Sequence, residues 1–222
     1  MPDAPSSPTT TPEEVLAAAK QMLADGLVEG TSGNISGRLP DGLVCLSPSS
    51  VPYDTMTLDD LVVVDLDGKV VQGERSPTTE KDLHLGALRR YPELGSVIHT
   101  HAVYATMFAL AHEPVPAVIE EVVVYVGGDV PCCEYKGTGT ADLGDEVADH
   151  LADRGAALLA NHGLVTCAST PGKALHIAAL VGFGRLAGEH AGVGLAQLRD
   201  AFGPRGPLPR SELEPARTRP GR

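Results

Sequence analysis

The stretch Ser96-Val97-Ile98-His99-Thr100-His101 carries the signal that decides the fold and points to its chemistry. Its apolar start predicts a β-strand over 96–101, which leads into a helix over 102–111. Side chains two residues apart lie on one face of a strand, so both imidazoles point the same way, as two ligands of one metal ion must. A pair at this spacing also arises by chance, so a metal site needs further ligands.

Two further candidate ligands lie far from this pair in the sequence. His162 follows an apolar strand predicted over 156–160, and Glu80 stands at the start of a helix predicted over 79–90. Either residue alone is more often structural. Three imidazoles beside one carboxylate, however, form a donor set for a divalent cation, with zinc as the default and manganese or cobalt as alternatives. The predicted metal ligands are Glu80, His99, His101 and His162.

The remaining histidines receive no metal role. His84 follows Glu80 by one helical turn, and we expect it to be a packed or solvated helix residue rather than a support for the ligands. The other four lie on helices or at helix ends, where solvated or capping roles are expected: His112, His150, His176 and His190.

Three polar stretches supply hydroxyl groups and backbone N–H groups without a lysine. They are Thr31-Ser32-Gly33-Asn34, Ser47-Pro48-Ser49-Ser50 and Thr78-Thr79. Loops and helix starts of this kind can bind a phosphate group through backbone N–H donors, although each alone is usually a turn or a cap. The Gly-x-x-x-x-Gly-Lys-Ser/Thr pattern of a nucleotide P-loop is absent from the sequence. If the three stretches converge near the metal, they indicate a phosphorylated small molecule as the ligand.

The rest of the chain shows interleaved helical and strand patterns. A capping box, Thr11-Pro12-Glu13-Glu14, begins a first helix that ends at Gly26, and residues 30–37 read as a polar loop. Asp67-Gly68 joins two strands in a hairpin. Further elements are strands over 43–46, 61–66, 69–72, 122–126 and 164–167, and helices over 140–154 and from 171 onward. Helices alternating with strands around a hairpin predict a three-layer α/β or α+β domain with a mixed sheet.

The composition and the ends of the chain narrow the functional classes. Among 222 residues, 17 basic and 29 acidic side chains give a formal net charge of −12, so a nucleic acid would be repelled. With no membrane-length apolar run and no secretory signal, we expect a cytoplasmic protein that does not bind membranes. The domain is expected over 12–201, between a disordered lead (1–11) and a disordered Pro/Arg-rich tail (202–222). The cysteines show no Cys-x-x-Cys spacing and are expected to be small core residues: Cys45, Cys132, Cys133 and Cys167.

Together and in this order, the motifs resemble the class II aldolase/adducin family from about Pro12 to Ala191. The matching stretches are Gly-Thr-Ser-Gly-Asn-Ile-Ser (30–36), Leu-Ser-Pro-Ser-Ser-Val-Pro-Tyr (46–53), Pro-Thr-Thr-Glu (77–80), His-Thr-His (99–101) and Asn-His-Gly-Leu (161–164). The resemblance implies an α/β fold of three layers, α-β-α, with a largely antiparallel mixed central sheet. It also implies a homotetramer with active sites at the subunit interfaces.

The resemblance further implies a reaction. The three histidines match zinc ligands, and Glu80 matches a carboxylate that ligates the resting metal and then acts as acid and base. The residues expected to bind the substrate phosphate are Thr31, Gly33, Asn34, Ser49, Ser50, Thr78 and Thr79. The implied activity is zinc-dependent, reversible cleavage of an L-fuculose 1-phosphate-like ketose 1-phosphate. Its products are dihydroxyacetone phosphate and a small aldehyde, formed through a metal-stabilised enediolate.

Other members of the family leave alternatives open. A sugar-phosphate 4-epimerase breaks an equivalent bond but usually has Asp in place of Glu80, and decarboxylases have similar metal sites. A non-catalytic adducin-like scaffold generally lacks the histidines found here. Family aldolases carry a catalytic tyrosine ahead of a Gly-Gly pair, where this chain has Glu120 and Glu121, so the acid that protonates the aldehyde oxygen is unassigned. Tyr125 is predicted to be a buried strand residue.

Overall fold

The computed structural model describes residues 8–182, which form eight strands, six α-helices and one short 3-10 helix, η1 (Leu58–Asp60). The strands are β1 (Asn34–Arg38), β2 (Val44–Leu46), β3 (Val62–Val64), β4 (Val70–Gln72), β5 (Ser96–Thr100), β6 (Cys132–Cys133), β7 (Ala156–Leu159) and β8 (Gly163–Ala168). The α-helices are α1 (Pro12–Ala24), α2 (Lys81–Arg90), α3 (Val103–Ala111), α4 (Glu120–Val126), α5 (Ala141–His150) and α6 (Pro171–Gly182).

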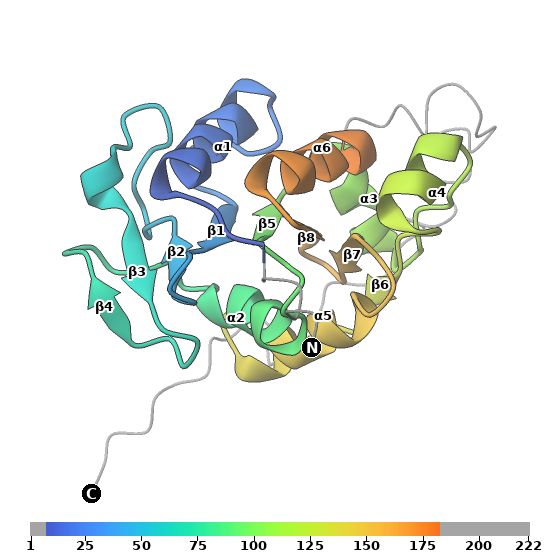
Figure 1. Cartoon of the computed structure of the whole chain (residues 1–222). Helices are drawn as coiled ribbons and strands as arrows, with labels where there is room; N and C mark the ends of the chain where they lie inside the picture. The colour runs from blue at the N-terminus through green and yellow to red at the C-terminus, as the bar shows by residue number, and fades with distance from the viewer. Residues whose placement is uncertain (1–7, 183–222) are drawn as a thin grey trace, which may run out of the picture. The chain divides into compact units, whose positions relative to one another are not determined.

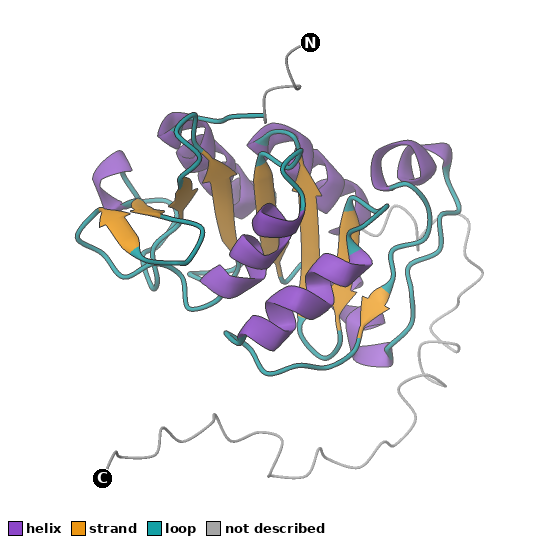
Figure 2. Ribbon diagram, turned by 60° about the horizontal axis from the view of Figure 1, so that its bottom comes forward, coloured by secondary structure: helices purple, strands orange, loops and turns teal. Residues whose placement is uncertain are grey.

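All eight strands belong to one sheet in the order β4-β3-β2-β1-β5-β8-β7-β6. Every neighbouring pair is antiparallel except β6 and β7, which are parallel. Helices cover both faces of the sheet, α2 and α5 on one and α1, α3, α4 and α6 on the other (Figures 1 and 2). The predicted three-layer α/β fold with a largely antiparallel mixed sheet is therefore confirmed.

The alternation of side chains along β5 assigns its residues to the two helix layers. Val97 packs in the cluster formed with α2 and α5, whereas Ile98 packs in the cluster formed with α1. His99 therefore lies on the α2 side. Its cross-strand partner on β1 is Asn34, which shares that face.

The first helix begins as its sequence predicts. The side chain of Thr11 accepts a hydrogen bond from the backbone N–H of Glu14, the Glu14 carboxylate accepts one from the N–H of Thr11, and Pro12 is the first helical residue. Residues 1–7 of the predicted lead and the whole predicted tail lie outside the described residues. Thr10, within the predicted lead, is buried and its N–H donates to the carbonyl of Arg38.

The strand predicted over 122–126 is wrong, because this run is helix α4. Ile119 precedes the helix in an extended conformation, Glu120 and Glu121 occupy its first turn, and Gly127 ends it with φ +99°. Val122 and Val126, four residues apart, face the core, so helical packing overrides the β-propensity of the valines. Tyr125 is consequently 51% exposed and not buried as predicted.

The polar loop predicted over 30–37 is also partly wrong, because Asn34–Arg38 is the fully buried strand β1. Its small residues serve close packing instead of a turn. A Cβ at Gly37 would collide with side-chain atoms of Thr10 and Val15, so α1 and the segment before it could not pack against β1.

Two simpler expectations concern membranes and cysteines. None of the helices within residues 8–182 is long and apolar enough to cross a membrane. All four cysteines are free, as predicted, and three of them are buried. Burial raises the pKa of the Cys45, Cys133 and Cys167 thiols to about 12, so these thiols behave as inert core groups.

We expect Gly144→Ala to lower the free energy of unfolding by at least about 1 kcal/mol, because a Cβ there would collide with the carbonyl oxygen of Asp82 where α5 crosses α2. The better helix propensity of alanine opposes this effect but does not remove the clash. Urea denaturation measures the change. Gly172→Ala is the matched control, because a Cβ at this exposed helical glycine meets no atom within 4 Å. Equal stability of the two variants would contradict this account of the helix crossing.

Candidate metal centre

Sheet topology brings the three predicted histidine ligands together. Strands β5 and β8 are antiparallel, with Thr100 opposite Leu164, so the end of β5 lies beside the start of β8. His99 is near that end of β5, His101 directly follows the strand, and His162 lies in the turn between β7 and β8. Residues more than 60 positions apart thus meet where the central strands β5 and β8 lie end beside start.

The three imidazole rings converge on a common point. The distances between ring centroids are 4.6 Å, 4.8 Å and 5.1 Å, and Nε2 of His99 lies 3.0 Å from Nε2 of His101. One possible ligand nitrogen of each ring lies within 4.8 Å of the others. His99 is fully buried, whereas His101 is exposed. The cluster therefore has a protected side and an open side.

The hydrogen bond made by Nδ1 of His99 determines the tautomer of this ring. Nδ1 donates a hydrogen bond to the carbonyl of Leu164 at 3.0 Å, so Nε2 carries the lone pair that faces the other rings. Burial holds the pKa of His99 well below its usual value, and the neighbouring His162 and His101 lower it further. Burial also lowers the pKa of His101 and of His162. Neutral imidazole is the form that binds metal ions.

A glycine next to His162 permits this convergence. A Cβ at Gly163 would lie 3.1 Å from Cδ2 of His101 and 3.2 Å from Cε1 of His99, and it would also press on the carbonyl of Thr100. The turn itself begins at Asn161, which adopts φ +60°. The Asn-His-Gly sequence is therefore explained by the space that the rings need.

Glu80 completes the cluster from the α2 side. It occupies the residue before α2 and is buried, with Oε1 3.3 Å from Nε2 of His162 and Oε2 3.5 Å from Nε2 of His99. Oε2 accepts a hydrogen bond from Nδ2 of Asn34 at 2.7 Å. Oε1 is buried with no hydrogen-bond partner among residues 8–182. A buried carboxylate oxygen without a partner is costly, and a cation at this point would satisfy it.

This donor set fits a divalent cation. Three neutral imidazoles and one carboxylate offer the nitrogen and oxygen ligands that zinc accepts, and the unpartnered Oε1 supplies an independent reason for a cation there.

The three hydroxyl-bearing stretches meet around Glu80. The backbone N–H of Ser49 donates to the carbonyl of Ser76, and that of Thr78 donates to the carbonyl of Ser47. The hydroxyl of Tyr53 donates to the carbonyl of Gly33 at 2.7 Å and so ties the third stretch to the same group. Ser50 adopts φ +60°, a strained conformation that is often found at functional sites.

The predicted phosphate-binding side chains differ in their accessibility. Thr31, Ser50 and Thr79 are exposed, and Ser49 is half-buried. The Thr78 hydroxyl is already engaged, because it accepts a hydrogen bond from the N–H of Glu80. The Asn34 amide faces Glu80 and His84 instead of an open pocket.

His84 is a packed residue of α2, one of the two environments predicted for it. It is fully buried, and its Nε2 lies 2.6 Å from Oδ1 of Asn34, while its Nδ1 lies 2.9 Å from Oγ of Ser36. Asn34 links it to Glu80 by hydrogen bonds, a connection that was not predicted from the sequence. The helical spacing to Glu80 was the available signal, but the partner strand could not be read from the sequence.

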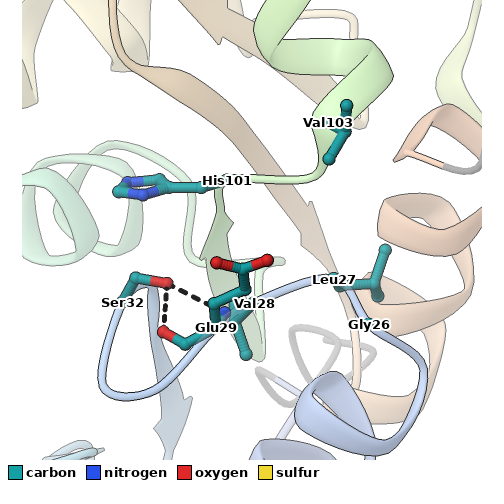
Figure 3. A pocket seen from close by; sticks show the side chains of 7 residues that line it. All are labelled: Gly26, Leu27, Val28, Glu29, Ser32, His101 and Val103. Carbon is teal, nitrogen blue, oxygen red and sulfur yellow. Dashed lines mark hydrogen bonds between the residues drawn. The ribbon is translucent and has the colours of Figure 1, made fainter.

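A pocket of about 350 Å³ opens beside His101, between the loop after α1 and the start of α3 (Figure 3). Leu27 and Val28 form part of its wall, and the Glu29 carboxylate lies below the segment from His101 to Val103. Ser32 and His101, which also line the pocket, belong to a predicted polar stretch and to the predicted ligands, whereas Leu27 and Val28 have no chemical signature in the sequence.

Comparison with known proteins agrees with the fold. A model of the class II aldolase and adducin N-terminal domain matches residues 13–183. A 5-deoxy-D-ribulose 1-phosphate aldolase from Bacillus thuringiensis serovar kurstaki is 38% identical over 172 residues, covering 77% of this chain and 80% of that protein. An L-ribulose-5-phosphate 4-epimerase from Salmonella paratyphi B is 44% identical over 121 residues, 54% of this chain and 53% of that protein.

A solved L-fuculose 1-phosphate aldolase has a TM-score of 0.75 and 30% identity, with 93% of this chain and 95% of that chain covered. Fold and site together define an α/β protein with a histidine-rich centre. The chain belongs to the class II aldolase/adducin family.

We expect the full chain to bind one zinc ion with His99, His101, His162 and Glu80 as ligands. In His162→Ala the affinity should fall by more than the roughly 10- to 100-fold loss that follows removal of an outer-shell partner. Competition with a chromophoric chelator measures it. His176→Ala is the control, because this exposed residue contacts the ring of Tyr125 and not the cluster. Equal zinc affinity in both variants would exclude His162 as a ligand.

Proposed function

We propose that this chain is a metal-dependent aldolase that reversibly cleaves a ketose 1-phosphate to dihydroxyacetone phosphate and a small aldehyde. The observation that carries the proposal is the convergence of three imidazoles and Glu80 beside three hydroxyl-bearing stretches. Relatives named as 5-deoxyribulose 1-phosphate and fuculose 1-phosphate aldolases support it.

The phosphate group of the substrate would lie against these stretches, which carry no lysine or arginine. Thr31, Ser49, Ser50 and Thr79 offer accessible hydroxyl or backbone donors, and Gly33 and Thr78 shape the loops. The first turn of α2 follows directly and directs the positive end of its dipole toward the same region. Neutral donors of this kind would bind a small phosphate group without a basic side chain, on a protein whose net charge is −12.

We assign Glu80, His99, His101 and His162 as the ligands of a divalent cation, with zinc as the proposed ion. When bound, that ion supplies a Lewis acid for the negative charge that develops on the substrate oxygens, a contribution worth several kcal/mol. The remaining chemistry falls to residues of the chain.

Glu80 is the proposed proton carrier. Asn34 holds Oε2, whereas Oε1 has no hydrogen-bond partner within residues 8–182, so Oε1 is the oxygen that could exchange a proton once substrate oxygens had taken its place as a ligand. When the carbon–carbon bond breaks, its electron pair stays with the carbon next to the carbonyl. The hydroxyl on the departing carbon loses its proton to solvent and becomes the aldehyde carbonyl. The protonated Oε1 gives its proton to the carbon next to the carbonyl, which completes dihydroxyacetone phosphate, and the carboxylate regains a proton from solvent; the reverse reaction runs the same transfers backward.

A 4-epimerase is the second candidate, because the Salmonella epimerase is 44% identical over 121 residues. An epimerase breaks an equivalent bond but keeps the aldehyde, turns it and closes the bond again. Release of the aldehyde is therefore the observable difference between the two functions.

Assays on a panel of sugar phosphates therefore distinguish the two functions. We expect the zinc-loaded full chain to release dihydroxyacetone phosphate from at least one ketose 1-phosphate and to leave L-ribulose 5-phosphate unchanged. A coupled assay for dihydroxyacetone phosphate and chromatography of the pentose phosphates measure the two outcomes. Glu80→Gln should lower aldol turnover by about 10²- to 10⁴-fold, the usual contribution of a positioned acid or base. Full turnover by that variant, or epimerisation without aldehyde release by the wild type, would refute the proposal.

We also propose that the chain forms a homotetramer. Apolar side chains on α3 and α4 are exposed, among them Val103 and Val124 at 66% each and Val123 at 52%. Val103 lines the pocket beside His101, so a second copy packed on α3 would also enclose that pocket.

We expect sedimentation equilibrium to give four times the mass of one chain, and Val124→Glu to shift the protein toward smaller species while its circular dichroism stays unchanged. A single-chain mass for the wild type would contradict the assembly.

A further inference from the structure

A connected row of buried polar side chains lies behind Glu80, and two of them, Ser36 and His84, have no role in the reaction proposed above. Ser36 and His84 are fully buried, and Asn34 is 4% exposed. The contacts run from Ser36 Oγ to His84 Nδ1 at 2.9 Å, from His84 Nε2 to Asn34 Oδ1 at 2.6 Å, and from Asn34 Nδ2 to Glu80 Oε2 at 2.7 Å. Side chains from β1 and α2 thus form one network that ends on the carboxylate.

The protons in this row have one consistent direction. The Glu80 carboxylate can only accept, so Nδ2 of Asn34 faces it and Oδ1 faces His84. Because Oδ1 can only accept, His84 Nε2 carries a proton and donates it. Burial lowers the pKa of His84 to about 4, so the ring is neutral and has a single N–H. Nδ1 is therefore an acceptor and receives the hydroxyl proton of Ser36, whose other contact, to the Val97 carbonyl, is longer at 3.4 Å.

The Glu80 carboxylate and the His84 N–H together fix the orientation of the Asn34 amide. With Oδ1 held by the His84 N–H, Nδ2 faces Glu80 and donates to Oε2. The opposite orientation would set Oδ1 against a carboxylate oxygen and Nδ2 against another N–H group, and both contacts would be repulsive. A buried ring that makes no hydrogen bond to Glu80 thus helps to keep the amide N–H directed at Oε2.

We propose that His84 is a positioning residue for Glu80: through the Asn34 amide it holds Oε2 and leaves Oε1 turned toward His162. This inference rests on the function proposed above for Glu80. Within residues 8–182 His84 makes no hydrogen bond to the predicted metal ligands, and among the substrate-binding residues it bonds only to Asn34, so the hydrogen-bonded link from His84 to Glu80 passes through that amide.

Two variants that differ in reach test the inference. His84→Gln carries an amide N–H as far from Cβ as Nε2 lies in histidine, so it can still donate to Asn34. His84→Asn reaches only as far as Nδ1, so it loses that donor while remaining polar and neutral. Thr166→Val is the matched control, because it removes a buried hydrogen bond of 2.9 Å, to the carbonyl of Ala174, on the opposite side of β5 from β1.

Zinc affinity of the full chain is measured first, by chelator competition, and kcat and KM follow for a ketose 1-phosphate that the wild type cleaves. We expect His84→Asn to weaken zinc binding about 10- to 100-fold and to lower kcat over a similar range, with KM changed less than about twofold. His84→Gln should stay within about threefold of the wild type in all three quantities, and Thr166→Val should lose stability but retain zinc affinity.

Wild-type zinc affinity and kcat in His84→Asn would overturn the inference, and so would equal losses in His84→Asn and His84→Gln, which indicate a purely structural role. A wild type that binds zinc but cleaves no ketose 1-phosphate would refute the proposed function, and the ranking of zinc affinities would still decide the role of His84.

Discussion

The register of β5 against its two neighbours is the constraint on which the site depends. On one side Asn34 of β1 lies opposite His99, and on the other Leu164 of β8 lies opposite Thr100. The first pairing places an amide beside the Glu80 carboxylate, and the second brings the turn that carries His162 to the end of β5. A shift of one residue would send the side chain of His99 to the other face, away from α2, and would dismantle the cluster.

Close approach of backbone segments is the second requirement, and glycines meet it. Gly163 leaves room for the imidazoles of His99 and His101, and Gly33 lets its loop approach the carbonyl of His99. Gly37 does the same between β1 and α1. The site therefore combines buried strands with loops whose close approach depends on these glycines, because a side chain at any of them would push the segments apart. Its open side, at His101, adjoins the pocket and the exposed apolar residues of α3.

The sequence alone predicted the layered fold and the grouping of Glu80 with the three histidines. Histidine and carboxylate side chains at strand and helix ends can be recognised as candidate ligands without knowledge of the packing. It was insufficient where tertiary contacts set the outcome. Val122 to Val126 has the composition of a strand but becomes helix α4, since Val122 and Val126 meet the core one helical turn apart. Asn34 to Gly37 reads as a loop because most of its residues are small and polar. Those residues are required by packing and by the hydrogen bonds to His84 and Glu80. That network joins residues 34, 36, 80 and 84, and no local spacing predicts it.

The central claim is that four side chains, distant in sequence, hold one cation. Anomalous diffraction at the zinc absorption edge from crystals of the zinc-loaded full chain tests it most directly. The account predicts one strong peak in each chain, about 2.0–2.1 Å from a ring nitrogen of His99, His101 and His162, with an oxygen of Glu80 about 2.0–2.2 Å away. A peak at another group of residues, or a zinc-loaded chain whose three imidazoles have no peak between them, would contradict it.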